Sequence, residues 1–180
     1  QKKGFIAAPD YKQITAEAGH VAWDMGSYAW LLEEGQDFDS IHPSLQRQAI
    51  LNMAYGLYEV LPDKIYQVRG YDLANISFIK SDTGWIVFDP LTAKETAAAA
   101  LKFINEQLVE RPVTAVVYSH SHADHFGGVR GVVDEADVVP DGIQFAQILR
   151  ELSNLRELDK DAEKKARFWL WWGVAAIVVA

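Results

Sequence analysis

The chain has 180 residues, of which 49% are apolar and 23% are charged, and it contains no cysteine. These values match ordinary globular domains and exclude a disordered chain, while the net charge of −8 and the lack of a basic stripe argue against a nucleic-acid partner. Without cysteine, any metal must be held by imidazole and carboxylate groups.

The N-terminal third, residues 4–61, is rich in aromatic and turn-forming residues and is expected to wrap over a core as an irregular segment. Within it, QRQAILNMAYGL places apolar residues from Ile50 to Leu57 at roughly helical spacing, after Pro43 and Ser44 as start signals. One helix is therefore predicted there.

Three short runs rich in β-formers follow at residues 65–68, 76–79 and 85–88, and they predict an antiparallel meander. The sequence SDTG between the second and third runs is a hairpin signal. A helix is then predicted within TAKETAAAALKFINEQLVE, with Thr92 as the N-cap and Glu95 at the capping-box spacing.

The apolar run VTAVVYSH predicts a buried strand after that helix. A strand, a helix and a strand in this length imply a parallel pair with a right-handed crossover, and functional loops of such sheets lie at the carboxyl ends of the strands. Asp89 and the sequence SHSHADHFGG both fall at such ends.

The end of the chain differs in character. An amphipathic helix is predicted by an apolar face whose members are Phe145, Ile148, Leu149, Leu152 and Leu155. The last thirteen residues, FWLWWGVAAIVVA, are uncharged, but a membrane-spanning helix needs about 20 apolar residues. We therefore expect this segment to cover an exposed part of the core, and contact with a membrane is the less favoured alternative. No signal-peptide pattern is found at the N-terminus, and the other two histidines, His20 and His42, are expected to be surface or capping residues.

Three histidines and one aspartate gather in the pattern H-x-H-x-D-H, formed by His120, His122, Asp124 and His125. Residues two apart at a strand end can share one cation, and the following turn can bring Asp124 and His125 to a second. Two such metals could hold a bridging water and lower its pKa to about 7. The following glycine pair would let the backbone pass close to the metals. A solvated polar loop is the alternative, and this clustering favours the metal site.

The motif resembles that of the metallo-β-lactamase superfamily. Together with HPSLQRQAILNMAYGLYEV, IYQVRGYDLANISFI and DTGWIVFDPLTAKETAAAAL, it resembles the N-terminal catalytic region of the alkyl sulfatases, which hydrolyse long-chain sulfate esters such as dodecyl sulfate. The resemblance implies an α/β fold of the αβ/βα sandwich type, of which this chain would carry the N-terminal half. Because residues after about 138 do not match, two parts are expected: a catalytic portion, 1–138, and a helical extension, 139–180.

The resemblance also implies a dinuclear zinc site and hydrolysis of an alkyl sulfate to alcohol and sulfate. His120 and His122 would hold the first Zn²⁺, and Asp124 and His125 the second, with Asp124 also the catalytic residue. Asp89 would not bind the metal but would orient a metal ligand through a hydrogen bond. The alternative is that Asp89 is only a turn residue at the end of a strand.

The family's later segments supply further carboxylates and another histidine, whereas this chain has no histidine after His125. Two hypotheses follow: a zinc-dependent alkyl sulfatase in incomplete form, or an inactive truncated or fused fragment that binds zinc weakly. Another hydrolase of the superfamily is a third. An alkyl sulfate substrate, a homodimer and a periplasmic or secreted location are what the resemblance implies.

Overall fold

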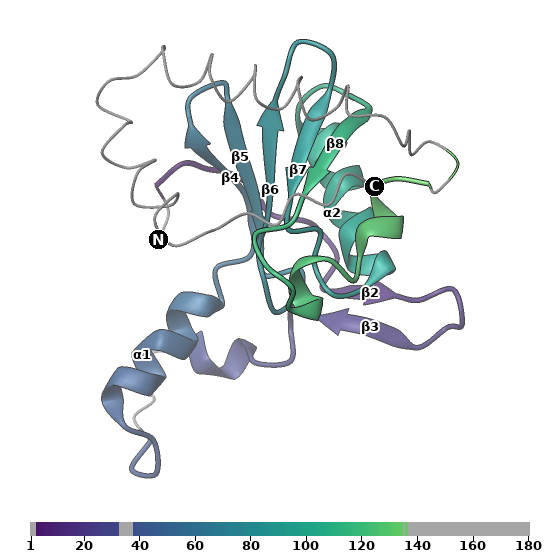
Figure 1. Ribbon diagram of the computed structural model, residues 1–180. Coiled ribbons are helices and arrows are strands. Elements are labelled where there is room, and N and C mark those ends of the chain that lie inside the picture. The colour runs from purple at the N-terminus through teal and green to yellow at the C-terminus, as the bar shows by residue number, and fades with distance from the viewer. Residues whose placement is uncertain (1–2, 33–37, 135, 137–180) are drawn as a thin grey trace.

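The structure is a computed structural model that describes residues 3–32, 38–134 and 136. Its centre is a six-stranded sheet in the order β1-β4-β5-β6-β7-β8. The strands of this sheet are β1 Phe5–Ala7, β4 Gly56–Leu61, β5 Ile65–Arg69, β6 Ile76–Lys80, β7 Trp85–Phe88 and β8 Val113–Val117. A separate hairpin pairs β2 (Gln13–Thr15) with β3 (Val21–Asp24). In Figure 1, helix α2 (Lys94–Gln107) lies beside the sheet, and helix α1 (Pro43–Asn52) points away from it.

The predicted meander and crossover are both confirmed. Strands β5, β6 and β7 pair antiparallel in sequence order. Helix α2 then connects β7 to β8, and these two strands pair in parallel. The SDTG turn closes the β6–β7 hairpin, where the amide of Ser81 donates to the carbonyl of Gly84 at 2.9 Å. The parallel pair places the residues that follow β7 and β8 at the same edge of the sheet (Figure 1).

The N-terminal third is more regular than the sequence indicated. Residues 4–61 contain strands β1 to β4, a short 3-10 helix at Ala29–Leu32, and α1, so the expectation of an irregular segment is wrong. Helix α1 confirms the predicted helix, although Leu57 belongs to β4. His42 is its N-cap and accepts a hydrogen bond from the amide of Ser44 at 3.2 Å, which confirms a capping role for this histidine.

The start of α2 corrects the capping prediction. The N-cap position is Ala93 and not Thr92, and the methyl group of Ala93 cannot accept a hydrogen bond. No side-chain capping bond is formed at this end of α2, so the predicted capping box with Glu95 is absent. The Thr92 hydroxyl instead donates to a carboxylate oxygen of Asp72 at 2.7 Å. The start of α2 is thus tied to another part of the chain.

The core lies between the sheet and α2. Ala97 and Ala100 of α2 are fully buried, so the helix packs closely on the sheet, and Trp85 and Phe78 fill the sheet side. The opposite face of the sheet carries a second apolar cluster made of Ile79, Ile86, Ala115 and Val117. Strands that are apolar on both faces are typical of layered α/β folds, and this explains their nearly unbroken apolar sequences.

The predicted C-terminal amphipathic helix and the apolar end of the chain lie outside the described residues. Within the described part of the chain, no helix has the length and apolar character needed to cross a membrane.

Candidate metal centre

The H-x-H-x-D-H motif begins three residues after β8 ends at Val117, and Asp89 directly follows β7. Because β7 and β8 are parallel neighbours, their ends meet, and the amide of Asp89 donates to the carbonyl of Val117 at 3.0 Å. A short 3-10 helix, Ala123–His125, then turns the chain so that the motif folds back on itself.

The four predicted metal ligands lie together. The Nε2 atom of His120 is 2.9 Å from Nδ1 of His122, and the ring centroids of His120 and His125 are 4.0 Å apart. A carboxylate oxygen of Asp124 lies 3.3 Å from Nε2 of His125. His120 and His122 are exposed, while Asp124 and His125 are half-buried, so the cluster is open to solvent on one side.

Asp89 contacts this cluster directly at His125 and indirectly through Ser119. Its Oδ2 is 2.9 Å from Nδ1 of His125 and accepts the hydroxyl hydrogen of Ser119 at 2.7 Å, while its Oδ1 accepts from the Ser119 amide at 2.7 Å. Ser119 Oγ in turn lies 2.9 Å from Nδ1 of His120. A carboxylate that accepts from Nδ1 of a histidine leaves Nε2 to face a metal, which is the arrangement that orients metal-binding histidines.

Sequence reasoning missed Ser119, and the signal was its place: a hydroxyl residue between a buried strand and the first histidine of the motif. Asp89 has a positive φ of 56°, a conformation that aspartate tolerates better than most residues. Its strand-ending turn conformation and its contact with His125 therefore coexist.

The donor chemistry of the motif fits zinc, because neutral imidazole and carboxylate are the ligands that Zn²⁺ accepts without sulfur. The side chains are nevertheless not arranged around a common point. Within residues 3–32, 38–134 and 136, no group of three or more histidine, aspartate or glutamate side chains is placed to hold a metal. His120 and His122 are instead hydrogen-bonded to each other, and four side chains are too few to complete two tetrahedral ions.

The glycine pair after the motif packs on the segment before α2, while the prediction that it lets the backbone pass close to the metals stays a prediction. The amide of Gly128 donates to the carbonyl of Leu91 at 2.9 Å, and a Cβ atom at Gly128 would lie 2.2 Å from the carbonyl oxygen of Pro90. A Cβ at Gly127 would lie 2.4 Å from the carbonyl oxygen of Thr92. The missing side chains thus let the motif loop pack directly on the 89–93 segment.

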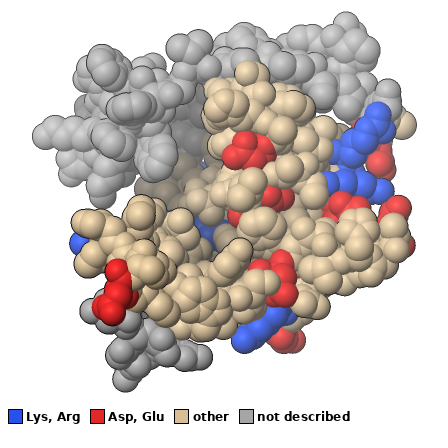
Figure 2. Space-filling model, turned by 90° about the horizontal axis from the view of Figure 1, so that it is seen from below, with Lys and Arg blue, Asp and Glu red and all other residues tan. Residues whose placement is uncertain are grey.

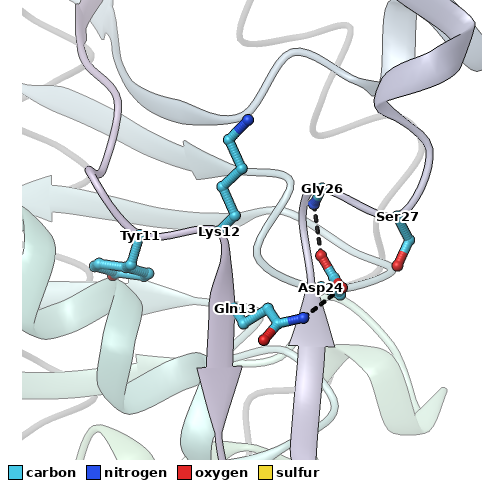
Figure 3. Close-up of a pocket in the computed structure, with 6 residues that line it drawn as sticks. All are labelled: Tyr11, Lys12, Gln13, Asp24, Gly26 and Ser27. Atoms are coloured by element: carbon cyan, nitrogen blue, oxygen red, sulfur yellow. Dashed lines mark hydrogen bonds between the residues drawn. The ribbon is translucent and has the colours of Figure 1, made fainter.

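A shallow depression on the β2–β3 hairpin shares no residue with the motif. It is lined by Tyr11, Lys12, Gln13, Asp24, Gly26 and Ser27 (Figure 3). Asp24 accepts hydrogen bonds from the Gln13 side chain at 2.8 Å and from the Gly26 amide at 2.7 Å, and these bonds lower the pKa of its carboxyl group. The carboxylate is therefore used in shaping the hairpin.

Charged side chains are interspersed on the face shown in Figure 2. Acidic and basic groups are mixed on this face, and the described residues visible there form no continuous basic stripe. This distribution matches the acidic composition of the chain.

Comparisons with known proteins give the motif its context. Residues 69–145 match the metallo-beta-lactamase superfamily. The "(R)-specific secondary-alkylsulfatase" of Pseudomonas sp. is 51% identical over 137 residues, and the "Linear primary-alkylsulfatase" of Pseudomonas sp. is 48% identical over 136 residues; each alignment covers 76% of this chain and 20% of the relative. The "Alkyl/aryl-sulfatase BDS1" of Saccharomyces cerevisiae is 42% identical over 143 residues, covering 79% of this chain and 22% of the relative.

The fold comparison agrees with the sequence comparison. The solved structure of the "stereoselective inverting sec-alkylsulfatase Pisa1 from Pseudomonas sp." superposes with a TM-score of 0.70 at 52% identity, over 76% of this chain and 21% of that one. The described part of the chain has the α/β fold of the metallo-beta-lactamase type, which confirms the fold class predicted from the sequence. Its homologues are alkylsulfatases, which confirms the resemblance predicted from the sequence. The chain spans about a fifth of the length of the curated relatives it matches.

Proposed function

We propose that the protein hydrolyses alkyl sulfate esters to an alcohol and sulfate, with zinc held by the H-x-H-x-D-H motif. The observation that carries the proposal is the gathering of four ligand-type side chains, with Asp89 behind them, at the carboxyl ends of two parallel strands. It occurs in a chain about half identical to proteins named as primary and secondary alkylsulfatases. Long-chain esters such as dodecyl sulfate are the proposed substrates.

The proposed roles of the four side chains are those that the resemblance to the alkyl sulfatases implies. His120 and His122 would hold one Zn²⁺, and Asp124 and His125 would hold the other. Bound zinc supplies Lewis acidity, which activates water near neutral pH and offsets the negative charge of the sulfate oxygens. Asp124, which already lies within the cluster at 3.3 Å from His125, is the proposed catalytic carboxylate.

Asp89 and Ser119 orient the rings in this proposal. Asp89 acts on His125 directly through the 2.9 Å contact and on His120 through the Ser119 hydroxyl. Both contacts engage Nδ1 atoms, so both rings would present Nε2 to a metal. The two histidines are then oriented by one carboxylate.

A second candidate, an inactive fragment that binds zinc weakly, is favoured by one observation. Four candidate ligands serve two ions, and no described group of three side chains is arranged to hold a metal. A homodimer and a periplasmic or secreted location stay predictions that nothing in the structure tests.

Sulfate release from dodecyl sulfate and from a secondary alkyl sulfate tests the proposal, with the purified chain assayed before and after removal of zinc by a chelator. We expect turnover that is lost with the metal and in His122→Ala, and kept in His20→Ala, which changes an exposed histidine outside the motif. Bound zinc without turnover on either ester would favour the inactive fragment.

A further inference from the structure

A buried carboxylate outside the motif, that of Asp72, makes an unusually dense set of hydrogen bonds. Asp72 follows β5 and is only 6% exposed. Its oxygens accept from the Thr96 hydroxyl at 2.6 Å, the Thr92 hydroxyl at 2.7 Å, and the backbone amides of Thr92 and Ala93 at 3.1 and 3.3 Å. These donors all belong to the segment that leads into α2 and to its first turn.

This carboxylate supports the start of α2 from outside the helix, through the two residues that precede Lys94 and through the Thr96 hydroxyl. The first amides of a helix lack partners within the helix, and a negative charge at that end is favoured by the helix dipole. Ala93 at the N-cap has no side-chain acceptor, and the Asp72 carboxylate, about twenty residues earlier in the chain, binds the amides of Thr92 and Ala93 just before the helix. The start of α2 is therefore held in place by the loop after β5.

The histidine motif packs on the segment that Asp72 holds. Gly128 donates to the carbonyl of Leu91, and glycine at positions 127 and 128 allows contact with the carbonyls of Thr92 and Pro90. Asp89 at the beginning of the same segment contacts Ser119 and His125. One short stretch, residues 89–93, thus touches both ends of the motif loop.

The stretch would not keep this shape without support. Asp89 and Leu91 both have positive φ values, 56° and 62°, a conformation that non-glycine residues seldom adopt and that is more strained for leucine than for aspartate. Such a conformation persists when the surroundings fix it, and the carboxylate of Asp72 fixes its carboxyl-terminal end.

We infer that Asp72 is a positioning residue for the histidine motif: it fixes the 89–93 segment, and through that segment it sets the places of Asp89, Ser119 and Gly128. Asp72 makes none of the contacts to the histidines. The effect of Asp72 on metal binding rests on the proposed function, but its effect on the position of the motif can be measured without metal.

Hydrogen exchange of the zinc-free protein is the direct test, because exchange of a protected amide reports the local opening that exposes it. In Asp72→Asn we expect exchange of the Ser119 and Gly128 amides to rise about five- to thirtyfold, the factor expected when buried hydrogen-bond donors lose their acceptor. The matched control is Ser81→Ala. Ser81 is also buried and multiply bonded, but it lies at the opposite end of β7, where its hydroxyl accepts from the Gly84 amide at 3.1 Å. This control should raise exchange at Gly84 and leave Ser119 and Gly128 unchanged.

Two further variants keep the test decisive if Asp72→Asn does not fold. Thr96→Val removes one hydroxyl donor at constant size, and Thr96→Ser keeps it, so only the first should raise exchange at Ser119 and Gly128. Unchanged exchange at these amides in Asp72→Asn and Thr96→Val, or an equal rise in Ser81→Ala, would overturn the inference.

A second measurement connects the inference to the site. The dissociation constant for zinc should rise about tenfold in Asp72→Asn, at the low end of the effect of residues that support metal ligands. If exchange rises as expected while wild-type protein binds no zinc, the positioning role stands and the proposed function fails.

Discussion

Replacement of Gly128 by alanine tests how the motif loop is held against α2. The backbone at Gly128 has φ −83° and ψ 5°, which any residue can adopt, so the cost of a methyl group comes from space alone. That methyl would lie 2.2 Å from the Pro90 carbonyl oxygen, 2.6 Å from the Ala93 carbonyl oxygen and 3.0 Å from the Ala97 Cβ. Two of these neighbours are backbone atoms that cannot rotate away, so the loop must move.

We expect Gly128→Ala to lower the free energy of unfolding by about 3 kcal/mol, the upper part of the range for overpacked sites. In a chain of this size that corresponds to a fall of about 6–12 °C in Tm. The control is Gly26→Ala, where φ is also ordinary and the nearest atom is an Asp24 side-chain oxygen at 3.2 Å. It should change stability by less than about 1 kcal/mol.

Denaturant unfolding of the two variants beside wild type provides the measurement. Equal stability of Gly128→Ala and wild type, within about 0.5 kcal/mol, would refute the close packing of the motif loop on the 89–93 segment.

Three other predictions concern the site, the core and alkaline pH. Asp89→Asn should weaken zinc binding by about 10–100-fold, measured by competition with a chromophoric chelator, because the amide cannot replace a carboxylate toward both Ser119 and His125. Ile104→Ala, on the fully buried face of α2, should cost about 2–5 kcal/mol in denaturant unfolding, and a value below about 1 kcal/mol would contradict the described core. Burial raises the pKa of the Tyr71 hydroxyl above its ordinary 10.0, so the folded state favours the protonated form: the associated stability is present below pH about 10 and is lost as the pH rises further. Tyr71→Phe should therefore flatten the alkaline fall in the free energy of unfolding, and an unaltered pH profile would count against this assignment.

Much of the central sheet could be predicted because its signals are local. Strands β5 to β8 are short apolar runs separated by turn residues, and the SDTG hairpin needs only neighbours in sequence. The N-terminal strands could not be predicted in this way. Strand β1 has only three residues, and Phe5 and Ile6 are exposed, so its pairing with β4 leaves no periodic pattern in the sequence.

The candidate site divides along the same line. The four ligand-type residues stand within six positions, and their clustering was evident from spacing alone. The support of α2 by Asp72 was not, because Asp72 reaches Thr92 and Thr96 across more than nineteen positions and only the fold brings them together. The same is true of the glycines, whose close neighbours are carbonyls of the 89–93 segment.

The central claim is that the H-x-H-x-D-H motif holds zinc, and equilibrium zinc binding to the purified chain tests it most directly. The account predicts tight binding to wild type and to His20→Ala, and binding weakened by at least about tenfold in His122→Ala. Equal zinc binding in all three proteins, or no zinc bound by wild type, would contradict it.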